Sequence, residues 1–131
     1  MRNITVAAVG LLMMAAPAFA HHPFDSEFDA KAPITLKGKV TDVEWQTPHV
    51  VFKMEAPDSQ GKMMSWNLEA ASPDEMKTLG WTDKTLKAGD QITVQGFKAK
   101  AETSTVVAAR SIELPDGKKM SSAGNDGGPK A

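Results

Sequence analysis

The residues of this sequence best suited to chemistry are its three histidines, His21, His22 and His49. A histidine at a free amino terminus binds a metal ion through both its α-amine and its ring nitrogen, and a second imidazole adds a third nitrogen. Nitrogen ligands in a tetragonal arrangement favour Cu(II) or Ni(II), although imidazole also binds zinc. We therefore predict a metal site built from these histidines, with copper as the candidate ion. The alternative is that the histidines are simply solvated.

The chelate at His21 requires that the chain be cleaved directly before this residue. Residues 1–20 have the three parts of a signal peptide: Arg2 is positive, residues 4–16 carry no charge, and Ala18-Phe19-Ala20 has the small residues that precede a cleavage site. The alternative is a membrane anchor, but a spanning helix needs roughly 20 apolar residues, and this stretch is shorter. We predict export to the periplasm, cleavage after Ala20 and no membrane insertion of the mature chain.

His49 is the candidate for the second imidazole. Residues 49–55 alternate, with Val50, Phe52 and Met54 on one side, so His49 faces away from the core that they would form. His22 could take this role instead, or all three histidines could meet. Methionine sulfur is a less favoured ligand, because Met54 lies on the apolar face and methionine fills irregular gaps in a core.

Other chemistries have little support in the sequence. It has no Gly-x-Ser-x-Gly motif and no glycine-rich phosphate loop before a helix, and its acidic residues form no pair with distinct acid and base roles. We therefore expect no enzymatic activity. The net charge of −1 and the lack of interleaved basic and aromatic residues argue against nucleic acid as a partner.

A non-catalytic interaction module is the alternative to a metal-binding protein. Such a module would bind a peptide, a glycan or a protein of the cell envelope. Trp45 comes shortly after a bend that we predict near residues 41–42 of the first strand, and it lies near His49 in the sequence. Trp45 and Thr47 are therefore the candidate ligand-binding residues. The sequence leaves the oligomeric state open.

Apolar periodicity predicts one domain over residues 35–118, all-β with one short helix. Strand patterns cover residues 35–45, with a bend near residues 41–42, and residues 49–55, 63–70, 91–98 and 105–114. Ser72-Pro73-Asp74-Glu75 is typical of a helix start between the third and fourth strands. This order is that of the OB-fold, a small five-stranded, partly open barrel, and a small antiparallel β-sandwich is the alternative. Residues 21–34 are predicted to form an extended N-terminal arm, and residues 119–131, poor in large apolar side chains, a disordered tail.

The sequence also resembles a family of small, uncharacterised bacterial periplasmic proteins with a His-His pair at the mature amino terminus. The features that carry this resemblance are His21-His22 with Phe24 and Phe28-Asp29, residues 35–40, Val43-Glu44-Trp45 with Pro48-His49, Gly80-Trp81-Thr82, residues 86–90, Arg110-Ser111 and residues 114–117. They extend over nearly the whole predicted mature chain. The resemblance implies export and one small domain, and it implies no particular activity.

Overall fold

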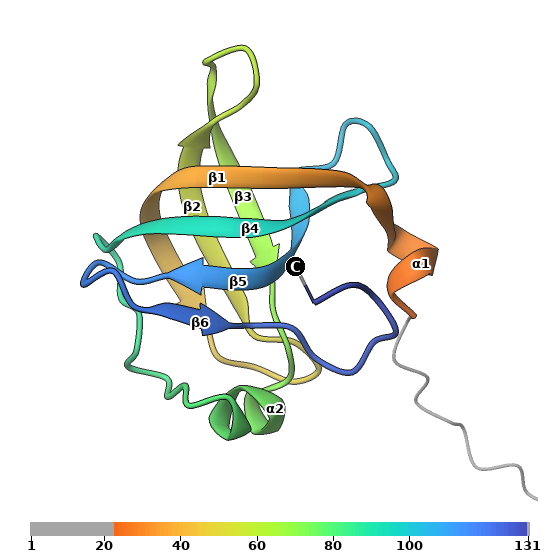
Figure 1. Ribbon diagram of the computed structural model, residues 1–131. Coiled ribbons are helices and arrows are strands. Elements are labelled where there is room, and N and C mark those ends of the chain that lie inside the picture. Colours follow the sequence, from red (N-terminus) through yellow and green to blue (C-terminus); the bar gives the residue numbers. More distant parts are fainter. Residues whose placement is uncertain (1–22, 131) are drawn as a thin grey trace, which may run out of the picture.

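The computed structural model describes residues 23–130, so the predicted signal peptide lies outside the described residues. Within this range the chain forms short helices and a sheet (Figure 1). The elements are α1 (Phe24–Glu27), β1 (Phe28–Glu44), β2 (Val51–Pro57), β3 (Met63–Glu69), α2 (Pro73–Thr78), β4 (Gln91–Ala99), β5 (Val106–Glu113) and β6 (Lys119–Ser121). None of the helices between residues 23 and 130 is long and apolar enough to cross a bilayer.

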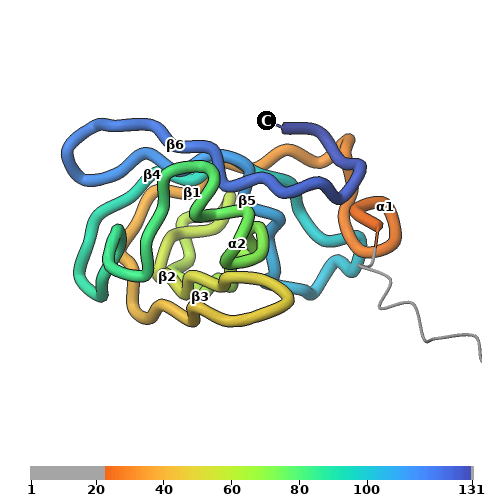
Figure 2. Tube along the Cα trace, turned by 90° about the horizontal axis from the view of Figure 1, so that it is seen from below, coloured from red at the N-terminus to blue at the C-terminus, as the bar shows by residue number. Residues whose placement is uncertain are grey.

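The strands form one sheet in the order β3-β2-β1-β4-β5-β6. A parallel pairing of β3 with β5 closes β1 to β5 into a ring, and the other neighbouring strands pair antiparallel. Figures 1 and 2 show α2 at one end of this ring. The predicted small all-β fold, with three strands, a helix and two strands in that order, is confirmed. Helix α1 and strand β6 are elements that the sequence pattern did not predict.

The main core lies inside the ring, and alternation is clearest along β2. In β2 the buried residues are Phe52, Met54 and Ala56, with exposed or half-buried residues between them. Trp81 is also buried, and its ring lies 5.5 Å from that of Phe52. A side chain of this size removes 150–250 Å² from water, so the aromatic pair contributes much of the apolar burial in the core.

Helix α2 begins where the sequence predicts. The Ser72 hydroxyl oxygen accepts a hydrogen bond from the Glu75 N–H at 3.2 Å, which satisfies one of the unpaired amides of the first turn. Met76 is the buried residue of the helix. Gly80, with φ of +96°, then turns the chain in a conformation that other residues rarely adopt.

Strand β1 is long enough to pair with β2 along its second half and with β4 along its first half. The register against β2 shifts between Val40 and Asp42, so the bend predicted near residues 41–42 is confirmed. At Gly38 an added Cβ would lie 1.9 Å from the Glu55 carbonyl oxygen. The strands therefore approach so closely here that only glycine fits.

The structure differs from the predicted extended arm, because β1 begins at Phe28 and not at residue 35, and α1 precedes it. Phe24, Phe28, Phe97 and Ala108 form a second, smaller apolar cluster. The Phe24 ring lies 5.6 Å from that of Phe28 and 5.7 Å from that of Phe97. These aromatic contacts hold α1 and the start of β1 against the sheet, although their sequence has no regular period.

The C-terminal segment also differs from its prediction, since residues 119–130 pack on the sheet instead of forming a disordered tail. Met120 and Ala123 are buried, and the backbone joins this segment to β5 through the Ser122 N–H and the Arg110 carbonyl. Its small residues permit close packing: a Cβ at Gly128 would lie 2.2 Å from Arg110 Nη2. Burial of small side chains and backbone hydrogen bonds here replace the large apolar residues that the sequence lacks.

Candidate functional site

His49 lies two residues before β2, where the chain crosses from β1, and both of its ring nitrogens have partners. Nδ1 lies 3.0 Å from the Ala70 carbonyl oxygen, and Nε2 lies 3.3 Å from Glu69 Oε1. The β2–β3 register positions these groups, because Val51 pairs with Glu69 and the Val50 carbonyl accepts from the Ala70 N–H. Two successive residues at the end of β3 therefore fix the imidazole from two sides.

The identity of these partners restricts the state of the imidazole. A carbonyl oxygen only accepts hydrogen bonds, so the contact with Ala70 requires a proton on His49 Nδ1. Nε2 of that tautomer is an acceptor that faces a carboxylate oxygen of Glu69. A proton or a metal ion on Nε2 would offset the negative charge that the Glu69 carboxylate presents to it. Histidines that bind metal usually donate their other ring N–H to a carbonyl or carboxylate in this way.

His49 and Glu69 line a cavity of about 280 Å³. Their side chains are 28 % and 24 % exposed, so the pair is accessible but partly shielded. The wall comes from β1, β3, α2, β5 and the C-terminal segment. Its other lining residues are Phe28, Ala70, Ala71, Glu75, Ala108, Arg110, Gly124, Asn125 and Asp126.

An ion pair between Arg110 and Asp126 also lines this cavity. The Arg110 side chain is 2 % exposed, and both of its terminal nitrogens lie 3.0 Å from the carboxylate oxygens of Asp126. Burial raises the pKa of Asp126, but hydrogen bonds from Arg110 and from the Gly128 N–H outweigh it and hold that pKa below its usual range. The charge of Arg110 is thus compensated inside the protein.

Glu75 is a third carboxylate at the cavity, and its oxygens are used in structural contacts. Oε1 accepts from the Ser72 hydroxyl at 3.1 Å, and Oε2 accepts from the Asn125 N–H at 2.8 Å. Glu75 thereby connects the start of α2 to the C-terminal segment. Among Glu69, Glu75 and Asp126, the carboxylate that faces a histidine is Glu69.

The N-terminal part of the described chain is anchored by residues that line the same cavity. The Phe24 N–H donates to the Asp126 carbonyl at 3.0 Å, and the Arg110 guanidinium lies 4.5 Å from the centre of the Phe24 ring. His21 and His22 lie outside the described residues. Within residues 23–130, no group of three His, Cys, Asp or Glu side chains is arranged to hold a metal ion. Any complete site therefore needs a ligand from elsewhere.

Trp45 and Thr47, the candidate ligand-binding residues, are separate from this cavity. Trp45 is half-buried and packs against the main core, and Thr47 is exposed on the segment between β1 and β2. Neither residue lines the cavity beside His49. The structure therefore brings His49 together with Glu69 and not with Trp45.

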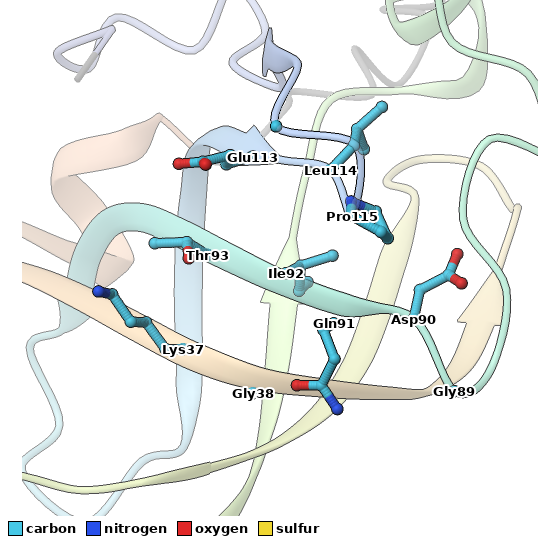
Figure 3. A pocket seen from close by; sticks show the side chains of 11 residues that line it. Lys37, Gly38, Gly89, Asp90, Gln91, Ile92, Thr93, Glu113, Leu114 and Pro115 are labelled. Carbon is cyan, nitrogen blue, oxygen red and sulfur yellow. The ribbon is translucent and has the colours of Figure 1, made fainter.

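A larger, more open hollow of about 690 Å³ lies on another part of the surface (Figure 3) and shares no lining residue with the first. Lys37, Thr93 and Glu113 lie at paired register positions on β1, β4 and β5 along it. Asp90 at its edge accepts hydrogen bonds from the Lys87 N–H and amine. Polar side chains from three neighbouring strands line this hollow, as on a solvent-exposed face of a sheet. No histidine is among its lining residues.

Glu69 was not singled out as a site residue from the sequence, although a signal for it exists. The turn at residues 58–61 joins two alternating segments, and a hairpin closed there pairs residue 51 with residue 69. His49 extends two residues beyond that pair and must lie beside the end of the third strand. The register of this hairpin therefore predicts that the Glu69 carboxylate lies next to His49.

The chain was compared with known proteins. Residues 8–108 match the model of a family of unknown function, DUF6152, and the chain belongs to this family. No curated protein and no solved structure matches the chain.

Proposed function

We propose that this member of the DUF6152 family is an exported, periplasmic protein that binds a divalent transition-metal ion at the cavity beside His49. His49 Nε2 supplies one ligand. After cleavage behind Ala20, His21 supplies its α-amine and its imidazole, with His22 as the alternative imidazole. The amine and imidazole nitrogens form the donor set that favours Cu(II). The function is binding and not catalysis.

The observation that carries this proposal is the arrangement of the two ring nitrogens of His49. Nδ1 is held by the Ala70 carbonyl and Nε2 faces Glu69, and both His49 and Glu69 line the cavity. A fixed tautomer and ring orientation are what outer hydrogen bonds provide for metal-binding histidines. A histidine whose only role is to enter a strand needs no such arrangement.

The anchoring of Phe24 supports a contribution from the amino terminus. Asp126 and Arg110 contact Phe24 and also line the cavity that holds His49. Phe24 is the third residue after His21, and this length of chain spans at most about 10 Å. Anchoring at Phe24 therefore keeps the proposed chelate close to the cavity and lowers the entropic cost of bringing it to His49.

The test is Cu(II) titration of the mature chain beginning at His21, followed by calorimetry and electron paramagnetic resonance. His49→Ala, and a form with one glycine added before His21, should each weaken Cu(II) binding by at least about tenfold, because each removes a ligand. Thr47→Ala is the matched control, since this exposed neighbour lies outside the cavity. Comparison of the far-ultraviolet spectra of all forms checks that they fold.

The outcomes separate the parts of the proposal. If His49→Ala binds Cu(II) as tightly as the unchanged chain, the metal site at His49 is excluded. If only the glycine-extended form retains full affinity, the α-amine is not a ligand and the imidazoles alone hold the ion. The mass of the amino terminus purified from the periplasm tests cleavage after Ala20 independently.

A further inference from the structure

We infer that the last part of the chain, residues 122–130, is a strap that opens separately from the ring of strands and covers a carboxylate-binding site at Arg110. The ligand that fits this site is an extended peptide with an aspartate followed by glycine, as the strap itself has at Asp126. Figures 1 and 2 show this part of the chain running from β6 toward α1. The inference concerns Arg110 and requires no metal ion.

The strap has no large apolar side chain to hold it in place. Its buried residues are Ser122 and Ala123. It is held mainly by hydrogen bonds, such as the one at 2.9 Å from the Ser122 N–H to the Arg110 carbonyl. Each such bond contributes little net stability because both groups bond water when a segment opens, whereas each ordered residue costs conformational entropy. We therefore expect the strap to open at a lower free energy than the ring.

Buried polar atoms without a partner occur where the strap meets β5. Within residues 23–130, the buried side-chain nitrogen and oxygen atoms that lack a hydrogen-bond partner are Arg110 Nε and Ser122 Oγ. The backbones of these two residues are bonded to each other, so both atoms belong to one interface. Buried polar groups are nearly always paired in folded proteins, and an unpaired one costs free energy. The polar contacts of the closed strap are therefore less complete than those elsewhere in the described part of the chain.

The contact between Arg110 and Asp126 indicates which ligand the open site would bind. Both terminal nitrogens of Arg110 lie 3.0 Å from the carboxylate oxygens of Asp126, in an end-on arrangement that leaves Nε unused. A carboxylate bound side-on would donate an acceptor to Nε as well. The guanidinium also lies 4.5 Å from the centre of the Phe24 ring, a stacked position that fixes its orientation. A ligand carboxylate would thus form a hydrogen bond that Asp126 does not form.

The glycine at position 128 indicates that the ligand must be narrow. A Cβ at Gly128 would lie 2.2 Å from Arg110 Nη2 and 2.3 Å from Phe24 Cγ, so the strap backbone lies directly on these two side chains. Asp126 Oδ1 accepts from the Gly128 N–H at 3.0 Å, which fixes the carboxylate relative to the glycine. A peptide in this site therefore needs an aspartate with a glycine two residues after it.

The charges around the site restrict the ligand further. Glu69, Glu75 and Asp126 line the cavity together with Arg110. When the strap opens, Arg110 loses the carboxylate of Asp126, and one carboxylate from a ligand restores the balance. Additional negative charges would be repelled by Glu69 and Glu75. A peptide with a single aspartate is therefore favoured over a polyanion.

Hydrogen exchange followed by NMR tests the opening on the unchanged mature chain. The amides of Ser122, Asn125 and Gly128 all donate hydrogen bonds in the closed strap. They should exchange at least about a hundredfold faster than the amides of β2, because local opening needs less free energy than unfolding of the ring. Equal exchange rates would mean that the strap does not open by itself and would overturn the inference.

Fluorescence anisotropy with a labelled peptide of residues 122–130 tests the site. Gly128→Ala and Asp126→Asn each loosen the strap, so both forms should bind this peptide at least about tenfold more tightly than the unchanged chain, because more of the site is open. The same peptide carrying Asp126→Asn is the matched control ligand and should bind at least about tenfold more weakly. Asp83→Asn, in an exposed turn of the protein, should leave peptide binding unchanged.

Arg110→Lys tests the role of the guanidinium, since lysine keeps the charge but loses the paired donors. Combined with Gly128→Ala, it should abolish the preference for the peptide that contains aspartate. If the loosened forms keep a folded far-ultraviolet spectrum and bind neither peptide, or bind both equally, there is no carboxylate site under the strap. His49→Ala should bind the peptide as the unchanged chain does, so the loss of metal binding and the loss of peptide binding are separate results.

Discussion

Breaking the ion pair between Arg110 and Asp126 should strongly destabilise the protein, and Asp126→Asn tests this. Both terminal guanidinium nitrogens lie 3.0 Å from the carboxylate, and the side chains of Arg110 and Asp126 are 2 % and 22 % exposed. Removing one partner of a buried pair leaves the other charge uncompensated and costs about 3–5 kcal/mol. Because solvent reaches part of Asp126, we expect the lower end of this range, about 3 kcal/mol.

Thermal unfolding followed by circular dichroism measures this effect. For a domain of this size 1 kcal/mol corresponds to about 4 °C, so Asp126→Asn should lower the Tm by about 12 °C. Asp83→Asn is the control, since Asp83 is exposed in a turn and its loss should change stability by less than about 0.5 kcal/mol. The double change Arg110→Met with Asp126→Leu removes the lone buried charge and should cost less than Asp126→Asn alone.

One result would refute this reasoning. If Asp126→Asn melts within about 2 °C of the Asp83→Asn control, the ion pair contributes less than about 0.5 kcal/mol. The C-terminal segment would then be held by its backbone hydrogen bonds and by Met120 and Ala123 alone.

The remaining predictions concern the same segment and the elements that it contacts. The pKa of Asp126 is lowered in the folded state, so ionised Asp126 stabilises the fold at pH values above its unfolded-state pKa. This stabilisation is lost as the pH falls through the folded-state pKa. In urea unfolding at a series of acidic pH values, the free energy of unfolding should therefore fall more steeply for the unchanged chain than for Asp126→Asn. Gly128→Ala should lower the free energy of unfolding by about 1–3 kcal/mol in denaturant titrations, because the new methyl group would lie 2.2 Å from Arg110 and 2.3 Å from the Phe24 ring. Phe24→Ala should cost about 3–5 kcal/mol in the same assay through the loss of a fully packed ring, and an unchanged midpoint would mean that α1 is not docked in solution. Ser72→Ala should cost about 1 kcal/mol by removing the cap of α2, a loss that a Tm shift of about 4 °C would report.

The sequence predicted the ring of strands well because alternation is a strong signal when one face of each strand is buried. The order of strands and helix, the bend near residues 41–42 and the capped start at Ser72 all follow from local residue types and spacing. These features need no information about distant parts of the chain. They are the features that the structure confirms.

The two ends of the domain were harder to predict because their order depends on contacts between distant segments. Phe24 and Phe28 have no period of their own, and they are held by Phe97 and Arg110, which lie far along the sequence. The C-terminal segment has small side chains, and composition alone predicts disorder for it. Its ion pair joins Asp126 to Arg110 of β5, a contact between segments that composition does not reveal.

The candidate site was predicted in part. His49 was identified as a residue that faces away from the apolar side of its strand, and the structure places it at a cavity. Its partners Glu69 and Ala70 come from the far end of a hairpin, so residue type alone could not identify them. The contributions of His21 and His22 stay predictions, as does copper as the bound ion.

The hydrogen bond between the Phe24 N–H and the Asp126 carbonyl joins the two ends of the described chain. Nearly the whole described chain separates these two residues, so this contact is among the most non-local in the fold and closes a long loop at an entropic cost. The same C-terminal segment forms one wall of the cavity beside His49 through Gly124, Asn125 and Asp126. A chain truncated before residue 124 would therefore lack both this wall and the backbone partner of Phe24.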